Sequence, residues 1–294
     1  MPIEHYQLLT YAKAIAGDWE ARNQLGQFIA PNVVVGGGKF FYRDYKTGNA
    51  FKTVATRRAL GGPSARLAMD IDDIEDTTAE NTLEAFIDDQ ERINNPLTIS
   101  QIQRRKVADL TNTSMNNNLR QVMQLARTST TAVPGIGQWI THNDTTVDPI
   151  NEIDTQIKLM LDTTGILPNK LYFDASSWIV FRNHPAVLAR IKVGIAIINL
   201  DLVPSLFSIP LTPFVGGGAK YAEAGAKDLI VFRSDDEPST EDASFMKTFV
   251  QQEGRFTNVR GYRDENRSSD IYKLIWWQQL RVTGQALAFK LSLT

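Results

Sequence analysis

The sequence predicts an α+β fold, in which strands and helices occupy partly separate stretches of a 294-residue chain. Strand-like runs lie near both ends, and a long polar helical pattern fills part of the middle. Residues 139–192 then alternate a helix, a Gly-Pro break, a short strand at 171–173 and a further pair of helices. Segregated runs of strands and helices around such a unit are typical of α+β domains.

The composition is that of an ordinary globular protein. With 43% hydrophobic and 22% charged residues the chain can bury a substantial core. A formal net charge of −2 does not supply the attraction on which a dedicated DNA-binding protein relies. The absence of cysteine excludes disulfides, thiolate zinc sites and cysteine nucleophiles. We predict no signal peptide and no membrane partner, because no window approaches the roughly 18 apolar residues of a spanning helix.

Residues 1–32 form the first predicted segment. Tyr6, Leu9 and Ala16 recur at near-helical spacing, and Pro31 ends the pattern. We therefore predict a short amphipathic helical arm. Two alternatives stay open, because such a helix can dock on its own domain or reach a neighbouring subunit.

An extended loop over residues 33–75 is the second predicted segment. A run of valines, three glycines, alternating aromatic residues and a Lys-Thr-Gly-Asn turn predict a long β-hairpin. An isolated hairpin is at best marginally stable in water, so this limb needs a surface to lie on. The hinges that we predict for it are Gly36, Gly37, Gly38, Gly61 and Gly62.

Charge is segregated along this loop and the stretch after it. The basic residues are Lys39, Arg43, Lys46, Lys52, Arg57 and Arg58. The acidic residues that follow are Asp70, Asp72, Asp73, Glu75 and Asp76. The two groups can be separate solvated faces, or complementary surfaces that meet within a subunit or between identical neighbours and set their register.

Two helices are predicted next. Thr77-Thr78-Ala79-Glu80 has the form of a capping box and predicts a helix over 78–92. Thr98 and Gln101 form a second box, which opens a helix over 98–127 about 45 Å long. The apolar stripe of this helix is thin and is interrupted by the asparagines at 116–118. We expect the helix to lie across a sheet or to be shared with other subunits.

The second half of the chain alternates helices and strands. Ile150, Ile153 and Ile157 mark the core side of a helix over 149–163. Asp174 is predicted to cap the helix after strand 171–173, and His184 to cap a final helix that begins at a proline. Further strands are expected at 228–233, 245–251 and 256–262, followed by a charged turn over 263–269. A closing hairpin about residues 283–284 is expected last.

No catalytic constellation, metal site or cofactor site emerges from the sequence. The histidines are scattered, and the acidic cluster lacks the glycine that an EF-hand has at its sixth position, where Glu75 stands. Residues Gly36 to Lys39 lack the spacing of a phosphate loop, and Phe40 occupies the place of its Ser or Thr. A nucleotide-binding enzyme that uses these four residues stays open as a weaker alternative.

In order and kind, these parts resemble the major capsid proteins of tailed bacteriophages, which have the Johnson or Hong Kong ninety-seven type fold. The stretches that carry the resemblance are 57–63, 98–127, Trp139, 148–150, 165–171, Trp178, 184–185 and 191–192. The resemblance implies an N-terminal arm, 1–32, and an extended loop, 33–75. It also implies a peripheral domain, 76–146 and 241–270, with a spine helix over 98–127, and an axial domain, 147–240 and 271–294.

The resemblance implies a non-enzymatic shell subunit. Pentamers and hexamers of such a protein tile an icosahedral head that encloses double-stranded DNA, with which it makes non-specific contact. Further implied partners are a portal and scaffolding or decoration proteins, and the implied location is the virion, assembled in the host cytoplasm. An encapsulin-type nanocompartment is the alternative use of the same fold. Besides the charged residues above, we expect subunit contacts at Arg263, Asp264, Glu265 and Arg267.

Overall fold

The computed structural model describes residues 5–45, 57, 72–130, 132–134, 137–140, 146–190, 199–216, 227–251 and 255–293. The chain divides into two compact units, each of which is built from separate stretches of sequence. Unit 1 comprises Met1–Phe41, Glu75–Met123 and Lys247–Arg281. Unit 2 comprises Tyr42–Ile74, Gln124–Met246 and Val282–Thr294. Among the described residues, no helix combines the length and apolar character needed to cross a membrane.

Unit 1 is built on a five-stranded sheet. Its order is β1 (Asn32–Val34), β8 (Met246–Val250), β10 (Ser269–Val282) and β4 (Ala79–Asp88), and β9 (Phe256–Asp264) also pairs with β10. Strand β10 runs antiparallel to both β4 and β9, whereas β1 runs parallel to β8. The strands predicted at 245–251 and 256–262 are confirmed.

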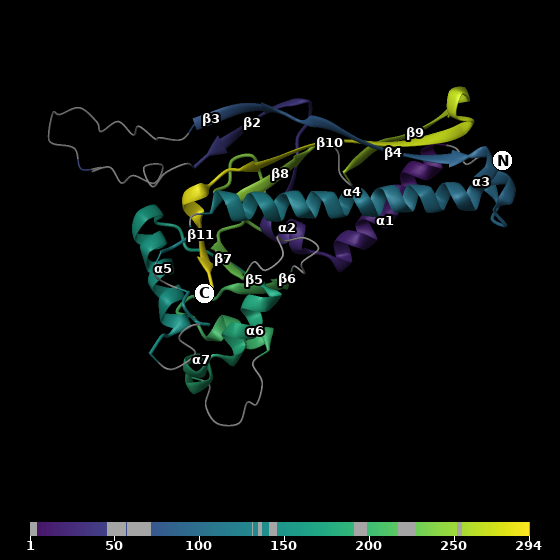
Figure 1. The fold of residues 1–294 in the computed structure, drawn as a ribbon. Coiled ribbons are helices and arrows are strands. Elements are labelled where there is room, and N and C mark those ends of the chain that lie inside the picture. The colour runs from purple at the N-terminus through teal and green to yellow at the C-terminus, as the bar shows by residue number, and fades with distance from the viewer. Residues whose placement is uncertain are drawn as a thin grey trace. The chain divides into compact units, whose positions relative to one another are not determined.

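Two helices cover one face of this sheet, α1 (His5–Arg22) and α4 (Ile99–Ser129), as Figure 1 shows. Leu8 and Ala12 of α1 are buried against a core that includes Val107 of α4 and Leu274 of β10. The N-terminal helix is therefore docked on its own unit, which is the first of the two alternatives for the arm. A short helix, α2 (Leu25–Ile29), follows it.

The predicted helix over 78–92 is wrong, because residues 79–88 form the edge strand β4 and a helix, α3 (Asp89–Asn94), begins only afterwards. Leu83 and Ile87 point into the core of unit 1 at a period of two, and β4 pairs with β10 along its whole length. The spacing of Leu83, Phe86 and Ile87 suits a helix, but pairing with β10 makes a strand in which Leu83 and Ile87 face the core and Phe86 faces outward. The cap lies at Asp88, whose carboxylate accepts a hydrogen bond from the Gln90 N–H at 2.7 Å.

The long helix is confirmed, and it is 31 residues long. The Thr98 N–H donates to the Gln101 side chain at 2.9 Å, which is half of the predicted capping box. The asparagine tract does not simply interrupt the apolar stripe. Asn118 is buried, and its amide lies 3.1 Å from the Gln278 side-chain nitrogen and 2.8 Å from the Arg255 guanidinium. A buried polar cluster thus takes the place of apolar packing at this turn.

The limb predicted over 33–75 is described at its two ends. Strand β2 (Lys39–Asp44) follows Gly36, Gly37 and Gly38 directly and pairs with β3 (Asp72–Thr77). The extended strand after the glycines is therefore confirmed. The predicted turn at 46–49 and the predicted hinges Gly61 and Gly62 lie outside the described residues.

Unit 2 contains a four-stranded sheet of order β11 (Ala288–Ser292), β7 (Asp228–Phe232), β5 (Lys170–Asp174) and β6 (Thr212–Gly216). The predicted strands at 171–173 and 228–233 are confirmed. Strand β5 is parallel to β6 and antiparallel to β7, and β7 is antiparallel to β11. The closing hairpin expected about residues 283–284 is wrong, because β10 pairs with β4 and β9 whereas β11 pairs with β7.

The helices of unit 2 are α5 (Pro149–Thr164), α6 (Ala175–Asn183) and α7 (Pro185–Arg190). Short 3₁₀ segments complete the described chain at Leu200–Ser205, Glu265–Arg267 and Gln285–Leu287. Ile153 and Ile157 of α5 pack with Phe173 of the sheet, as predicted. His184 caps α7, because its Nδ1 accepts a hydrogen bond from the Ala186 N–H at 3.3 Å.

A carboxylate in the first turn of α5 holds the start of the 139–192 stretch. Glu152 accepts hydrogen bonds from the buried Trp139 indole at 2.7 Å and from the Gly137 N–H at 3.0 Å. Gly137 has φ +85°, and a Cβ there would lie 2.9 Å from the Ser292 carbonyl oxygen. Only glycine combines this conformation with so close an approach to β11.

We expect Gly137→Ala to destabilise unit 2 by more than about 1 kcal/mol, because a left-handed conformation and a backbone clash act together. The measurement is denaturant unfolding of the purified protein. The matched control is Gly17→Ala, in the interior of α1, where a Cβ meets nothing within 4 Å. That change should stabilise by about 0.5–1 kcal/mol, and equal destabilisation by both would contradict the assignment.

Candidate assembly surfaces

The base of the limb carries charged pairs made within the chain. The Lys39 Nζ lies 3.2 Å from a Glu75 carboxylate oxygen in unit 1. In unit 2, the Arg43 guanidinium lies 3.6 Å from Asp73 and 3.8 Å from Glu241. The basic and acidic groups therefore meet within one subunit at these positions. Each pair is largely exposed, so it orients the strands more than it stabilises them.

Other members of the two groups are less defined. Lys46, Lys52, Arg58 and Asp70 lie outside the described residues. Arg57 is described and exposed, and Asp72 is the first residue of β3. Whether any of them contacts a neighbouring subunit stays a prediction.

Asp76 is held by Arg281, a partner that the sequence did not reveal. The Arg281 Nε lies 2.6 Å from one Asp76 oxygen and its Nη2 lies 3.2 Å from the other. Burial of Asp76 favours its neutral form, but the hydrogen bonds from Arg281 and from the Thr77 N–H outweigh this and hold the pKa of Asp76 below its usual value. Asp76 thus joins β3 to the end of β10.

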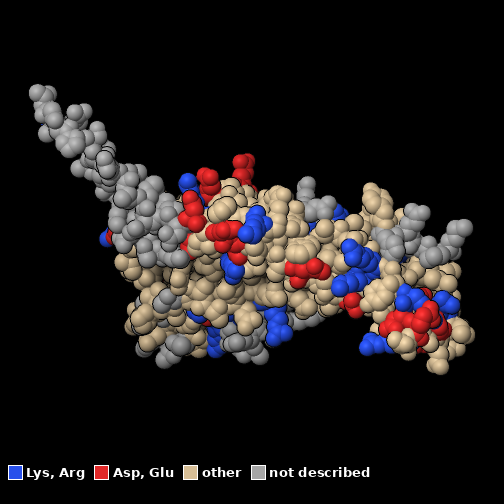
Figure 2. Space-filling view, turned by 90° about the horizontal axis from the view of Figure 1, so that it is seen from above, with Lys and Arg blue, Asp and Glu red and all other residues tan. Residues whose placement is uncertain are grey.

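The charged turn between β9 and β10 is confirmed, and it is organised by Arg263. This guanidinium makes two hydrogen bonds to Asp89 of α3, at 2.8 and 2.5 Å, and a third to Asp270 at 3.4 Å. The hydrogen bonds from Arg263 lower the pKa of Asp89. Arg92 also lies 3.6 Å from Asp270. Figure 2 shows acidic and basic side chains gathered at this end of unit 1.

Arg263 is therefore committed to its own chain, whereas other residues of the turn face solvent. The side chains of Glu265 and Arg267 are 83% and 78% exposed. Asp264 accepts a hydrogen bond from the Asn266 N–H at 3.1 Å and so shapes the turn. Of the four residues predicted here, Glu265 and Arg267 are the ones best placed to reach a neighbour.

An apolar stripe crosses the outer face of the unit 1 sheet. Phe86 of β4, Ile271 of β10 and Tyr262 of β9 stand side by side in the strand register, and Phe86 is 61% exposed. A hollow of about 330 Å³ lies beside Phe86, with Glu84 and Arg267 among its lining residues. This surface was not predicted from the sequence, because residues 78–92 were expected to form a helix. Exposed aromatic groups with a charged rim are typical of protein interfaces.

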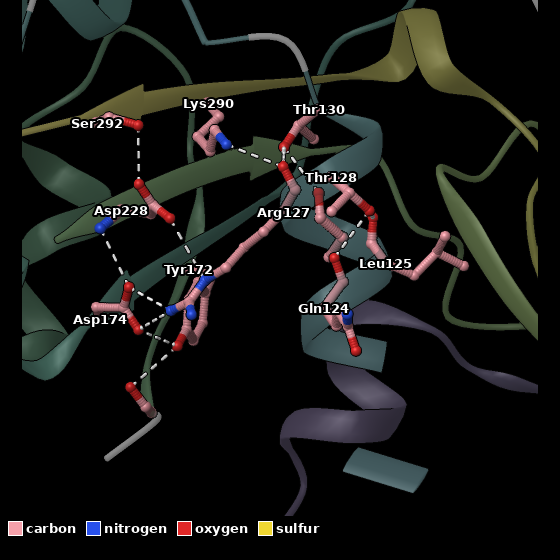
Figure 3. Close-up of polar contacts among 12 residues, drawn as sticks. Gln124, Leu125, Arg127, Thr128, Thr130, Tyr172, Asp174, Asp228, Lys290 and Ser292 are labelled. Carbon is pink, nitrogen blue, oxygen red and sulfur yellow. Dashed lines mark hydrogen bonds and ion pairs between the residues drawn. The ribbon is translucent and has the colours of Figure 1, made fainter. Parts of the chain in front are cut away.

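Unit 2 holds a buried charge cluster around the last turn of α4. Figure 3 shows the Arg127 side chain running to Asp174 of β5 and Asp228 of β7. Its Nη2 lies 2.7 and 2.6 Å from the two Asp174 oxygens, and its Nε lies 3.4 Å from Asp228. The Arg127 and Asp174 side chains are only 10% and 4% exposed. Asp174 therefore does not cap α6 through its side chain, contrary to expectation.

The cluster is closed by hydroxyl and amide donors. The Tyr172 hydroxyl donates to Asp174 at 2.7 Å, and the Asp228 N–H donates to the same carboxylate at 3.1 Å. The Ser292 hydroxyl donates to Asp228 at 2.8 Å. Burial raises the pKa of Asp174, against the opposing effects of the Tyr172 and Arg127 side chains. Burial also raises the pKa of Tyr172, so its hydroxyl keeps its proton.

Side chains of β11 and of the 3₁₀ segment before it satisfy carbonyl groups at the end of α4. The Lys290 Nζ donates to the Arg127 carbonyl at 2.9 Å, and the Gln285 amide donates to the Ser129 carbonyl at 3.1 Å. A cation beside the last carbonyls of a helix is favourable for its dipole. The end of the long helix is thereby fixed to the sheet of unit 2 by side chains from β5, β7 and β11.

We expect Arg127→Met to lower the free energy of unfolding by about 3–5 kcal/mol, because it leaves two buried carboxylates without their cation. Denaturant unfolding of the purified protein measures this. Arg120→Met, at an exposed position of the same helix, is the matched control and should change stability by less than about 0.5 kcal/mol. Equal effects of the two variants would contradict a buried role for Arg127.

Asp76 predicts a pH dependence. Its pKa is lower in the folded than in the unfolded chain, where the ordinary value is 3.8. Its ionic contacts therefore stabilise the fold above about pH 4, and this contribution is lost as pH falls through the depressed pKa. Asp76→Asn should destabilise by about 1 kcal/mol at pH 7, and the difference from the wild type should shrink as pH falls through the depressed pKa of Asp76. Thermal melts across this range, with the exposed Glu80→Gln as control, test it; a difference that persists at low pH would refute it.

No protein-family model matches the chain, and a search of curated proteins finds no match. Solved structures do match. A phage-related protein from Bordetella bronchiseptica shares 18% identity at a TM-score of 0.69, over 99% of this chain and 97% of the other. The mature capsid of bacteriophage PhiM1 gives 12% identity and 0.50, over 92% and 86%. The SrpI encapsulin from Synechococcus elongatus gives 12% and 0.53, also over 92% and 86%. The chain thus has the phage capsid fold of the Hong Kong ninety-seven type, along nearly its whole length.

Proposed function

We propose that this chain is a major capsid protein of a tailed bacteriophage, which self-assembles through pentamers and hexamers into an icosahedral shell around double-stranded DNA. The observation that carries the proposal is the fold itself, since 99% of the chain superposes on a phage-related protein. A limb whose two strands form a separate two-stranded sheet and an exposed aromatic stripe on the unit 1 sheet are features that neighbouring subunits would cover.

In this proposal unit 1 is the peripheral domain, α4 is its spine helix, and unit 2 is the axial domain. The limb from β2 to β3 is the extended loop. Gly36 to Gly38, at the start of β2, and the glycine pair at 61–62 are the hinges at which the loop would turn during maturation. Copies of the chain are the main partners, with a portal, scaffolding or decoration proteins and packaged DNA as further ones. The virion is the location, after assembly in the host cytoplasm.

The tests also distinguish two alternative functions. An encapsulin-type nanocompartment would form the same shell with protein cargo in place of DNA. A nucleotide-dependent enzyme would need the stretch from Gly36 to Lys39 to cradle phosphates. This stretch is followed by a strand instead of a helix, so it lacks the helix N-terminus of a phosphate loop. Lys39 is moreover paired with Glu75. Saturable ATP binding that Lys39→Ala abolishes would favour the enzyme.

Size-exclusion chromatography and negative-stain imaging of the expressed protein test the proposal. Shells of megadalton mass, or free pentamers and hexamers, are the expected result. A monodisperse monomer under all conditions, including in the presence of a scaffolding partner, would refute it. Double-stranded DNA inside particles from infected or lysogenic cells would select the virus over the nanocompartment.

The turn between β9 and β10 gives an assembly prediction. The double variant Glu265→Ala with Arg267→Ala removes two exposed charges and should raise the critical concentration for assembly about three- to tenfold, with no change in the melting temperature of the subunit. Arg263→Ala is the contrasting variant and should lower that melting temperature, because Arg263 holds α3 to the turn. Light scattering and thermal melts separate the two effects. Normal assembly of the double variant would show that this turn makes no contact.

A further inference from the structure

The end of strand β2 is held by a distant part of unit 2. Tyr45, the residue directly after β2, donates a hydrogen bond from its hydroxyl to the Glu241 carbonyl at 2.6 Å. Its N–H donates to the Thr283 carbonyl at 2.7 Å. All three residues belong to unit 2. We refer to residues 239–244 together with Thr283 as the limb socket.

Arg43 makes a second backbone contact with the limb socket. Its N–H donates to the Thr240 carbonyl at 3.1 Å. Arg43 and Tyr45 lie two residues apart, so their N–H groups point to the same edge of the extended chain. The socket therefore holds this edge through the backbone, in addition to the pairing of β2 with β3.

The limb socket is organised by its own contacts. The Asp242 carboxylate accepts hydrogen bonds from the Ser239 N–H at 2.6 Å and from the Ser244 hydroxyl. The Ser239 hydroxyl accepts from the N–H groups of Asp242 at 3.1 Å and of Glu241 at 3.2 Å. The Thr283 hydroxyl donates to the Ser244 carbonyl at 2.7 Å, and both of these residues are fully buried. These contacts do not involve Tyr45, so the socket keeps its shape without it.

Tyr45 is itself well seated in the socket. Its side chain belongs to the buried apolar residues of the chain, with an exposed fraction of 7%. Burial raises the pKa of Tyr45, so its hydroxyl keeps its proton and can donate to the carbonyl. Leaving the socket would expose the ring to water and break the hydroxyl contact, and the seated position is therefore favoured.

The three glycines that precede β2 are not required by the conformation seen here. Gly36, Gly37 and Gly38 all lack the left-handed φ that favours glycine, and a Cβ on any of them would meet nothing closer than 3.7 Å. An alanine would fit at each position. The conformational freedom of these glycines therefore serves a different direction of the chain.

We infer that the limb socket is a catch, which holds the base of the limb in the direction seen here until Tyr45 leaves it. This inference rests on the proposed function, which names the glycines at 36–38 as hinges, and it adds what restrains them. Strand β2 lies between the hinge and the catch. The hinge can therefore turn the strand only when the contacts of Arg43 and Tyr45 are open.

Hydrogen–deuterium exchange of the purified full-length protein, resolved to single amides, gives the first test. Tyr45→Phe keeps the ring and removes the hydroxyl, so the amides of Arg43 and Tyr45 should both exchange about fivefold faster. The amide of Val231 in β7 reports on unit 2 as a whole and should not change. The matched control, Tyr262→Phe, removes an exposed hydroxyl on β9 and should leave all three amides unchanged.

Ser239→Ala is a second variant, which alters the socket without changing β2. It should also speed exchange at Arg43 and Tyr45, because the Ser239 hydroxyl holds the turn that carries their acceptors. No change in either variant would overturn the inference. Faster exchange at Tyr45 alone, or an equal increase at Val231, would also overturn it, because the opening would then be local fraying or unfolding of the unit.

The hinge gives the last test. Gly36→Ala with Gly38→Ala fits the conformation seen here and restricts the others, so exchange at Arg43 and Tyr45 should slow about fivefold. Gly17→Ala in α1 is the matched control and should leave both amides unchanged. Unchanged exchange in the hinge variant would show that the catch opens without the glycines.

These measurements separate the catch from the proposed function, because they do not require assembly. A protein that forms no shells would refute the proposed function, and exchange at Arg43 and Tyr45 would still decide whether the socket is a catch. Shells formed by a protein whose exchange is the same in all variants would refute the catch alone.

Discussion

Unit 1 depends on the pairing of β10 with β4 on one side and with β9 on the other. The register with β4 is continuous from Ser269 and Asp88 to Gln278 and Ala79. It sends alternate residues of β10, such as Tyr272 and Leu274, into the core under α1 and α4. A slip of one residue would exchange the two faces and bury Lys273 instead. A charged contact lies near each end of this strand, where Asp270 meets Arg263 and Arg281 meets Asp76.

Unit 2 differs in that both faces of its small sheet are buried. One face carries Leu171, Phe173, Leu229 and Val231 into the helical core. The other presents the polar side chains that gather around Arg127. Burying these charges is unfavourable unless every group finds a partner, and here the partners come from three strands and from the last turn of α4. Such a cluster stabilises less than apolar packing would, but it admits few alternative arrangements.

The contacts at the limb change how its charges are understood. Lys39 with Glu75 and Arg43 with Asp73 pair within the subunit, so segregated charge in the sequence does not by itself identify an interface. The residues best placed for neighbours are those that the fold leaves exposed, even where they form surface ion pairs, as Glu265 does with Arg263 and Arg267 does with Asp264. In unit 1 these exposed residues include Phe86 and Tyr262 of the aromatic stripe and Glu265 and Arg267 of the turn.

The sequence by itself determined the elements whose periodicity or capping admits one interpretation. These are the long helix, the helix that begins after Asp148, the buried strands β5 and β7, and the extended strand after the three glycines. The resemblance to phage capsid proteins rested on the order of these parts. The order of these elements is set by the sequence, and the fold is built from them in that order.

Only the tertiary structure decided the rest. Residues 79–88 have a helix-like spacing, yet pairing with β10 makes them a strand, and β10 and β11 fit a hairpin in sequence but each joins a different sheet. Arg127, Asp174 and Asp228 come from distant parts of the sequence and give no local signal. The hydrophobic pattern of an element predicts which of its residues face the core. Which other element it packs or pairs with depends on residues far away along the chain.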